Sequence, residues 1–314
     1  MSALSAEIFV LNYNGRDLLA ECLPSVIEAA AASPVPCPVT VIDNSSTDDS
    51  LQVLKDRFPD IRVLPLPNRV LCSFNDAARA SKADIVFLLN NDLKLDKGFV
   101  APLLRAFEEH SDAFLAAPKT WTFDNSRYEG SLSKMYFRFG QFGALSRFDG
   151  FAAKVDRPGL TMQSGFGAFH RQRFLELGGF DDLYLPGTVE DSDLGFRAYK
   201  KGYRGYYAPD SKAWHKGQAT FKRSFSSSRL LALNQRNLYL FVWKNISATE
   251  LVAQHLVWLF IRPALFMLRG RFEFLQGLFM AMPKAPLALK KRRTLRADKS
   301  VLTDRQVFVL SEGI

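Results

Sequence analysis

The chain has 314 residues, 47% of them hydrophobic and 23% charged, a composition that is typical of a globular protein and excludes a disordered one. Its net charge of +9 is uneven, because residues 221–314 hold 16 Lys and Arg against 5 Asp and Glu and carry +11, whereas the preceding residues hold 25 against 27 and carry −2. A nearly neutral body with a strongly basic C-terminal part indicates a surface-binding appendage.

Cysteine usage and the apolar segments predict a cytoplasmic protein. The three cysteines are odd in number and show neither a CxxC nor a zinc-binding spacing, so we expect reduced thiols. The N-terminus has no basic segment, and its apolar run is too short for a signal peptide. The longest apolar stretch, residues 251–268, is interrupted by Gln254, His255, Arg262 and Pro263, which argues against a membrane-spanning helix.

The first part of the chain alternates strands with helices. The hydrophobic patterns predict, in chain order, strand 7–12, helix 17–32, strand 39–42, helix 47–58, strand 61–66, helix 73–81, strand 84–89, helix 98–110 and strand 113–117. Such alternation predicts a parallel sheet with right-handed crossovers.

Polar residues follow four of these strands, namely Asn12, Asp43, Asn68 and Asp92. Asp92 comes directly after the apolar run 85–89, and a carboxylate at the end of a buried strand requires a cation, water or a ligand. Ligands bind at that edge of open α/β sheets, so the four side chains would line one crevice that suits a nucleotide. The alternative is that they are ordinary turn-forming Asn and Asp residues.

The first strand–helix turn has neither GxGxxG nor GxxxxGK[ST], which argues against a dinucleotide site and a P-loop. The phosphates of a nucleotide would then be neutralised by a divalent ion on Asp92. Oxygen ligands together with substrate phosphates suit Mg²⁺ or Mn²⁺.

Beyond residue 118 the patterns are weaker. Residues 121–151 are rich in Gly and aromatic residues, and they predict a substrate-binding loop or a hydrophobic flap. Glu190, Asp191 and Asp193 open a helix that stops at Gly202, where their mutual repulsion can raise a pKa as a general base requires. A helix cap paired with Arg197 is the alternative.

Helical segments with interleaved aromatic and basic residues follow from Ser228 to the end of the chain. This pattern favours an interfacial helix on an anionic membrane leaflet, with a helical cap or a dimer interface as the alternative. No nucleic-acid-binding module is evident, so we expect no nucleic-acid partner.

An ordered set of motifs over residues 6–220 resembles family 2 of the glycosyltransferases, which are inverting enzymes of the GT-A fold. The matching pieces are FVLNYNG, VIDNSSTDDS, FLLNND in place of the metal-binding DxD, SGFGAFHRQRFLELGGFDD, EDSDLGFRAYKKGYR and APDSKAWHKGQAT. The pattern is most similar to rhamnosyltransferase-like members that build bacterial surface polysaccharides.

The resemblance implies a role for each matching residue. Asp191 would be the catalytic base, Asp92 and His215 would hold the metal, and Asp43 would bind the nucleotide base. The remaining implied contacts are Asn12, Asn68, Asn75 and Asn91, with Asp43 and Asp92, for the donor and Glu190, Gly165 and Trp214 for the acceptor. His215, which follows a predicted strand 203–208 and a PDSKAW turn, carries no assignment by itself.

The expected architecture is α/β: a Rossmann-like, mostly parallel GT-A sheet flanked by helices, with a C-terminal helical extension. We expect a catalytic domain over residues 1–222, with a nucleotide-binding half about 1–118 and an acceptor-binding half about 119–222. Residues 223–314 would form the basic, membrane-associating region.

The implied reaction moves a sugar from dTDP-rhamnose or a UDP-sugar to a hydroxyl of a glycan or lipid-linked acceptor, at the inner face of the plasma membrane. An oligomer is possible. Two departures from the family pattern are Asn90 at the first DxD position and Val70 where Gly is usual. The rival hypotheses are a catalytically inactive nucleotide-sugar-binding or scaffold protein and a nucleotidyltransferase.

Overall fold

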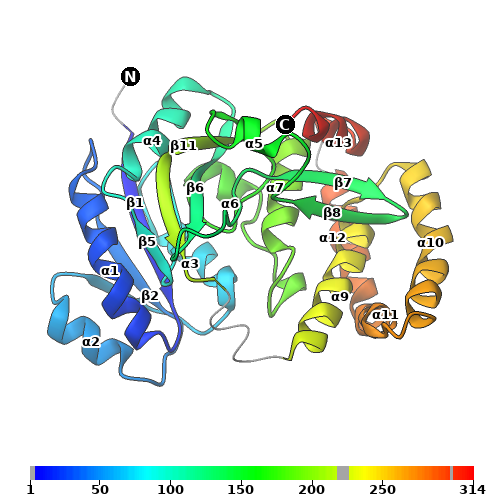
Figure 1. The fold of residues 1–314 in the computed structure, drawn as a ribbon, viewed down its shortest axis with the longest axis horizontal. Coiled ribbons are helices and arrows are strands. Elements are labelled where there is room, and N and C mark those ends of the chain that lie inside the picture. Colours follow the sequence, from blue (N-terminus) through cyan, green and yellow to red (C-terminus); the bar gives the residue numbers. More distant parts are fainter. Residues whose placement is uncertain (1–3, 218–225, 298–299) are drawn as a thin grey trace. The chain divides into compact units, whose positions relative to one another are not determined.

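The computed structural model describes residues 4–217, 226–297 and 300–314 (Figure 1). Contacts group the chain into two compact units. The sheet unit comprises Met1–Ser133, Ser146–Phe180 and Tyr203–Gly217, and the helical unit comprises Lys134–Leu145, Asp181–Gly202 and Gln218–Ile314.

One nine-stranded sheet forms the centre of the sheet unit. Its strands are β1 (Ala6–Asn12), β2 (Val39–Asp43), β3 (Arg62–Pro65), β4 (Ile85–Asn90), β5 (Leu93–Leu95), β6 (Ala113–Thr122), β9 (Gly159–Thr161), β10 (Gly167–His170) and β11 (Arg204–His215). The order is β3-β2-β1-β4-β10-β6-β11-β5, and β9 pairs with β11. The first four strands in this order are parallel, as predicted, whereas β10 runs antiparallel to both of its neighbours.

The predicted turn PDSKAW is wrong: these residues belong to β11, which continues to His215. The register against β6 jumps from Ala208 opposite Pro118 to Lys212 opposite Lys119, so the intervening residues form an irregularity within the strand. Pro and Asp in the sequence mark this bulge and not the end of the strand. The consequence is that β11 carries Trp214 and His215 on regular strand pairing next to β5 and β6.

The helices of the sheet unit flank this sheet. They are α1 (Arg16–Ala31), α2 (Ser50–Arg57), the 3₁₀ turn η1 (Val70–Cys72), α3 (Ser73–Ala80), α4 (Val100–Glu109), α5 (Phe151–Lys154) and α6 (Arg171–Glu176). In Figure 1, α1 lies across the strands β2 and β5, which it contacts.

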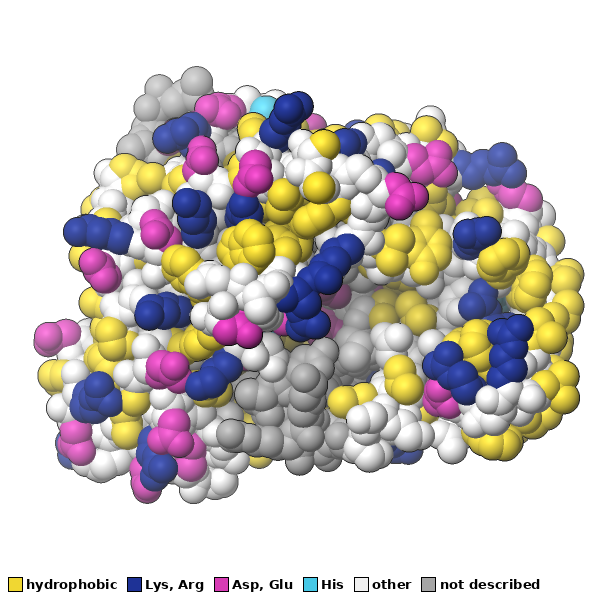
Figure 2. Space-filling model, viewed as in Figure 1, with side chains coloured by type: hydrophobic (Ala, Val, Ile, Leu, Met, Phe, Trp, Pro, Cys, Tyr) yellow, Lys and Arg dark blue, Asp and Glu magenta, His cyan; other side chains and the backbone are white. Residues whose placement is uncertain are grey.

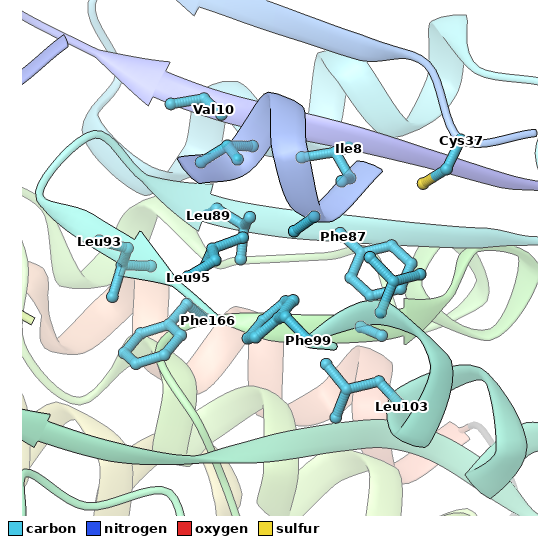
Figure 3. Packing of buried hydrophobic residues seen from close by; sticks show 14 of the residues in the cluster. Ile8, Val10, Cys37, Phe87, Leu89, Leu93, Leu95, Phe99, Leu103 and Phe166 are labelled. Carbon is cyan, nitrogen blue, oxygen red and sulfur yellow. The ribbon is translucent and has the colours of Figure 1, made fainter. Parts of the chain in front are cut away.

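Alternating side chains of the central strands build the core. Phe87 and Leu89 of β4 join a cluster that includes Ile8 and Val10 of β1 and Phe99 beside α4 (Figure 3). Val86 and Leu88, which alternate with them on β4, are equally buried and occupy the opposite face, as the period of two requires. Each buried side chain of this size contributes about 2 kcal/mol, so the strand ends are fixed firmly in place.

Where the structure describes it, the helical unit consists of a hairpin, helices and two 3₁₀ turns. Its elements are β7 (Lys134–Arg138), β8 (Gln141–Leu145), η2 (Asp182–Tyr184), α7 (Glu190–Lys200), α9 (Ser227–Asn245), α10 (Thr249–Met267), α11 (Glu273–Ala281), η3 (Met282–Lys284), α12 (Ala285–Ala297) and α13 (Asp304–Glu312). Residues 134–145, part of the predicted loop or flap, are therefore an antiparallel hairpin.

The helical unit combines segments from both sides of the predicted domain boundary at residues 222–223. That boundary lies outside the described residues, and so do the last three residues of the APDSKAWHKGQAT motif. The grouping differs from the predicted one because α9 packs on α7, α11 and α12, and α13 packs on α7 and β7. Buried Asp304 at the start of α13 accepts hydrogen bonds from Lys200 and from the backbone N–H groups of Ser247 and Ala248. The domain boundaries remain a prediction.

Candidate functional site

Asn12 and Asn91 join the ends of two neighbouring strands. Asn91 Nδ2 donates to Asn12 Oδ1 at 2.7 Å, and Asn12 Nδ2 donates to Ser46 Oγ at 3.1 Å. A Cβ on Gly15 would lie 2.0 Å from Asn91 Nδ2, so this turn accepts only Gly while the amide pair is in place. The amide pair thereby fixes the first strand–helix turn beside the predicted donor residues.

Asp43 lies opposite Asn12 in the parallel register of β1 and β2. Its Oδ2 accepts a hydrogen bond from the Ser46 backbone N–H at 3.2 Å, whereas its buried Oδ1 has no partner among the described residues. The neighbouring Asn44 Oδ1 is also buried and without a partner among them. Buried acceptors are normally satisfied, so both oxygens are placed for a ligand or water that donates hydrogen bonds.

Asn68 stabilises a strained turn, since its Oδ1 accepts a hydrogen bond from the Val70 N–H at 3.0 Å. Val70 has a φ of +52°, a left-handed conformation that is unfavourable for a β-branched residue. This is the position at which Gly is usual in the family pattern. The chain thus keeps the backbone conformation of a glycine turn while presenting a Val side chain.

Replacement of Val70 by Gly is expected to raise the free energy of unfolding by up to about 1 kcal/mol. The relief of left-handed strain, about 1–2 kcal/mol, exceeds the backbone entropy cost of Gly, about 0.5–1 kcal/mol. Denaturant unfolding measures the difference. Val70→Ala is the control because it keeps the strain, and a Gly variant no more stable than the Ala variant would contradict the explanation.

Asn75 has both of its polar atoms engaged. Its Nδ2 donates to the Phe180 carbonyl at 2.8 Å, and its Oδ1 accepts from the Phe180 N–H at 2.9 Å. These bonds hold the turn at Gly179, whose φ is +67°. The geometry favours a structural role for Asn75, and its predicted donor contact stays a prediction.

Asp92, His215 and Glu129 form a chain of charged side chains. His215 Nε2 lies 3.3 Å from Asp92 Oδ1, and its Nδ1 lies 2.9 Å from Glu129 Oε2. Arg127 in turn pairs with Glu129 at 2.9 Å. Asp92 Oδ1 has no partner with hydrogen-bond geometry in the described chain, so its short distance to His215 is an ion-pair contact only.

Burial acts to lower the pKa of His215, but its contacts with Asp92 and Glu129 outweigh burial and raise this pKa to about 9. The hydrogen bond from His215 lowers the pKa of Glu129 against the opposing effect of burial. Glu129 is therefore a carboxylate that accepts from Nδ1–H and fixes the ring with Nε2 directed at Asp92.

A divalent ion would find two protein ligands here, Asp92 and a His215 that releases its Nε2 proton as the ion binds. Asp92 Oδ1 and His215 Nε2 lie 3.3 Å apart, so one ion would contact both atoms. No group of three or more acidic, His or Cys side chains in the described part of the chain is arranged to hold a metal. Substrate phosphates and water would complete the shell, as is usual for Mg²⁺ and Mn²⁺.

Two predicted acceptor residues lie beside this group. Gly165 precedes Phe166, whose ring centroid is 5.5 Å from that of His215. Trp214 precedes His215 on β11, and its indole N–H donates to Asn125 Oδ1 at 2.6 Å. The sheet unit therefore brings Gly165 and Trp214 to the neighbourhood of Asp92 and His215.

Glu190 and Asp191 open helix α7 in the helical unit. Burial and the neighbouring Asp191 raise the pKa of Glu190 to about 8. Burial also raises the pKa of Asp191, although its Oδ1 accepts a hydrogen bond from the Ser192 N–H at 2.8 Å, which favours the carboxylate. Asp193 pairs with Arg197 at 2.8 Å, so the predicted pairing with Arg197 is confirmed for Asp193.

Sequence reasoning missed Glu129. It lies in the segment 121–151, where no periodicity or motif marks one acidic residue from another. Its backbone N–H donates to the Thr120 carbonyl of β6 at 2.9 Å, and Thr120 lies opposite Ala213 of β11, two residues before His215. Its single sequence signal is the neighbouring Arg127, which is too common a pairing to identify a site.

The sequence and the fold both match known proteins. The model of glycosyl transferase family 2 matches residues 7–177, more than half of the chain, and the chain belongs to this family. It is a glycosyltransferase with the GT-A fold, in which a mixed sheet is flanked by helices and followed by C-terminal helices.

One relative is the N-acetylglucosaminyl-diphospho-decaprenol L-rhamnosyltransferase of Mycobacterium tuberculosis, which is 26% identical over 232 residues, 66% of this chain and 75% of the relative.

Solved structures share the fold. GalNAc-T7 with UDP, GalNAc and Mn²⁺ has a TM-score of 0.59 at 15% identity; the match covers 77% of this chain but only about half, 48%, of GalNAc-T7. Residues 1–349 of S. aureus TarS give 0.53 at 17% identity, covering 98% of this chain and 89% of that one. Mannosyltransferase PcManGT from Pyrobaculum calidifontis, with GDP-Man and Mn²⁺, gives 0.52 at 14% identity, covering 99% and 85%.

Proposed function

We propose that this glycosyltransferase moves a sugar, with inversion, from dTDP-rhamnose or a UDP-sugar to a hydroxyl of a lipid-linked glycan acceptor in cell-surface polysaccharide synthesis. The observation that carries the proposal is the arrangement of Asp92, His215 and Glu129 at the carboxyl edge of the sheet. The family membership favours a glycosyltransferase over a nucleotidyltransferase or an inactive scaffold. The named relative, a rhamnosyltransferase acting on a diphospho-decaprenol acceptor, supports the donor and acceptor classes.

In the proposed reaction Asp191 accepts the proton of the acceptor hydroxyl. The acceptor oxygen forms a bond to the anomeric carbon from the face opposite the diphosphate, and the nucleoside diphosphate leaves with the electron pair of the broken bond. Asp92 and His215 would hold a divalent ion, which when bound supplies Lewis-acid stabilisation of the departing charge. Asp43 would accept hydrogen bonds from the nucleotide base through its unpartnered Oδ1.

Nucleotide binding is expected to depend on a divalent metal, and calorimetric titration with UDP, dTDP and GDP tests this. Each is titrated with Mg²⁺, with Mn²⁺ and with EDTA. Asp92→Ala should remove the metal-dependent part of the affinity. Glu129→Gln should weaken that part about 10-fold, because an outer-shell carboxylate orients the ligating His.

Glu176→Gln is the matched control in the sheet unit, since Glu176 pairs with the Tyr203 hydroxyl and lies on α6. We expect no change for it. Equal nucleotide affinity with EDTA and with metal would sink the metal assignment, and no binding of any nucleotide would favour the scaffold hypothesis.

A membrane-facing surface of the helical unit would bring the enzyme to a lipid-linked acceptor. Helix α10 alone in the described chain is long and apolar enough to cross a membrane, and most of its side chains are not buried. Phe260 is 73% and Leu268 82% exposed, and Phe272 and Phe279 of the next segment are also exposed. Figure 2 shows hydrophobic side chains gathered over the edge that α10 and α11 occupy, with Lys and Arg among them.

The C-terminal region thus divides into two parts. Helix α9 buries residues such as Leu240 and Phe241, which is the behaviour of a helical cap. The outer helices α10 and α11 present the apolar surface that suits an interfacial position on an anionic leaflet. Helix α10 is long and apolar enough to span a membrane, although Gln254, His255, Arg262 and Pro263 interrupt its apolar sequence. We favour the interfacial position because Arg262 donates a hydrogen bond to the carbonyl of Phe139 and so attaches α10 to the hairpin.

Replacing both Phe260 and Leu268 by Asp is expected to reduce sedimentation with anionic vesicles at least about 10-fold. Each buried apolar side chain contributes about 1.5–3 kcal/mol to insertion, and about 1.4 kcal/mol corresponds to tenfold. Val309→Asp is the control, because Val309 is 64% exposed on α13. Unchanged sedimentation of the double variant would contradict the proposed surface.

A further inference from the structure

The loop that leads into Asp191 is held in an unfavourable backbone conformation. Thr188 and Val189, which immediately precede helix α7, both have φ values of +73°. Two successive left-handed residues other than Gly cost about 1–2 kcal/mol each, so they persist only where surrounding contacts enforce them. The loop is two residues from the proposed base, which makes the enforcing contacts relevant to the reaction.

Those contacts come from two adjacent residues of α9. Asn237 is fully buried, and its Nδ2 lies 2.8 Å from the carbonyl oxygen of Tyr184, 2.6 Å from that of Gly187 and 2.9 Å from that of Thr188. It also lies 3.1 Å from Thr188 Oγ1. One amide group therefore gathers three carbonyls of the loop to a single point.

Arg236 completes the arrangement. Its Nη2 donates to the carbonyls of Leu185 at 2.6 Å and Tyr184 at 3.2 Å. Its Nε donates to Asn237 Oδ1 at 2.9 Å, which orients the Asn237 amide with Nδ2 toward the loop. Hydrogen bonds from a buried guanidinium are stronger than neutral ones, so the pair holds the loop from both ends.

The loop transmits this constraint to α7. The Val189 carbonyl accepts the Asp193 N–H at 2.8 Å and thereby forms the first turn of the helix, which contains Asp191. A general base must stay within hydrogen-bond reach of the proton that it removes. The direction of the Asp191 side chain is set by where this first turn begins.

We propose that Arg236 and Asn237, the loop clamp, are positioning residues for the transfer reaction, which they support by fixing residues 185–189 and hence Asp191. The inference rests on the proposed role of Asp191 as the base. Helix α9 belongs to the region that the sequence predicts to associate with membranes. The proposal gives this helix a role in positioning the catalytic base.

The test compares Asn237→Ala with Gln235→Ala in the full-length protein. Gln235 is a buried amide on the same helix, and it accepts a hydrogen bond from Gln141 of the hairpin and not from the loop. The assay follows dTDP release from dTDP-rhamnose with N-acetylglucosaminyl-diphospho-polyprenol as acceptor. Asn237→Ala should lower kcat about 100-fold, the cost of a misplacement near 1 Å, with dTDP affinity unchanged and kcat of Gln235→Ala nearly normal.

Equal kcat for the two variants would overturn the proposal. Should Asn237→Ala fail to fold, Arg236→Lys takes its place, because Lys keeps the charge but lacks the planar fork, and about a 10-fold fall in kcat is expected. Amide hydrogen exchange over residues 187–193 gives a second readout, and faster exchange than in Gln235→Ala is expected.

Unchanged exchange in the clamp variant would also overturn the proposal, even if this donor and acceptor pair gives no turnover. Asp191→Asn separates the two hypotheses. If it stays active, the base assignment fails; if it is inactive while the clamp variant matches Gln235→Ala, the clamp alone fails.

Discussion

Asp191→Asn is expected to lower kcat about 10³-fold, within the range that a positioned general base contributes, while nucleotide affinity stays the same. The substitution removes the only function of the carboxylate that the reaction requires, acceptance of a proton, and preserves the shape of the side chain. Turnover with dTDP-rhamnose and the lipid-linked acceptor measures kcat, and calorimetry with dTDP measures affinity. A variant with normal kcat would refute the assignment.

Two adjacent acids could serve as the base, and their surroundings distinguish them. Burial and the charge of Asp191 raise the pKa of Glu190 to about 8, so Glu190 is mostly protonated at neutral pH and cannot accept a proton. The carboxylate form of Asp191 is supported by the Ser192 N–H.

Glu190→Gln is the matched control, since it keeps a neutral hydrogen-bonding group where the protonated acid stands. We expect it to lower kcat about 10-fold, much less than Asp191→Asn does. Because the pKa of Asp191 is raised, wild-type activity should fall as the pH drops through that raised value, and the residual activity of Asp191→Asn should lack this dependence. An equal fall in kcat in both variants would contradict the assignment of Asp191 as the general base.

The sequence was sufficient to bring together the strand ends that we propose to bind the nucleotide, because the information there is local. Asn12, Asp43 and Asp92 each follow a short apolar run, and parallel strands bring such ends together regardless of the rest of the fold. The motifs then supplied the family, which the family model confirms.

Other features depend on contacts between distant parts of the chain. The PDSKAW residues read as a turn, but pairing with β6 and β5 on both sides keeps them in β11. Glu129 meets His215 because the segment after β6 folds back on Thr120, which pairs with β11. Asn237 and Arg236 show no motif in an apolar helical pattern, and their role appears only when α9 meets the loop before α7. Tertiary context decided each of these cases.

In the sequence, nothing distinguishes Lys244 from the other basic residues of the C-terminal region. In the structure it is buried between two carboxylates. Its Nζ is 2.6 Å from Asp181 Oδ2 and 2.7 Å from Asp193 Oδ1. Burial opposes ionisation of Asp181 and Asp193, but their cationic neighbours, Lys244 among them, outweigh it and lower the pKa of both carboxyl groups. Asn245 also donates to Asp193, at 2.7 Å.

Lys244→Met is therefore expected to reduce the free energy of unfolding by about 3–5 kcal/mol, the cost of leaving buried charge without its partner. The matched control is Lys291→Met, because Lys291 also pairs with Asp181, at 2.8 Å, but its side chain is 30% exposed. Partly exposed pairs contribute about 0–1 kcal/mol. Denaturant unfolding at pH 7 compares the two variants, and similar losses would contradict the importance of burial.

The deficit of Lys244→Met should depend on pH in a defined direction. Carboxyl groups whose folded-state pKa is lowered stabilise the protein above their unfolded-state pKa, about 3.9 for Asp, and this stabilisation is lost as the pH falls through the lowered value. The wild type has this contribution and the variant lacks it, so the difference between them should be full at pH 7 and shrink below about pH 4. A deficit that stays constant with pH would assign the loss to packing of the Lys244 side chain and not to its charge.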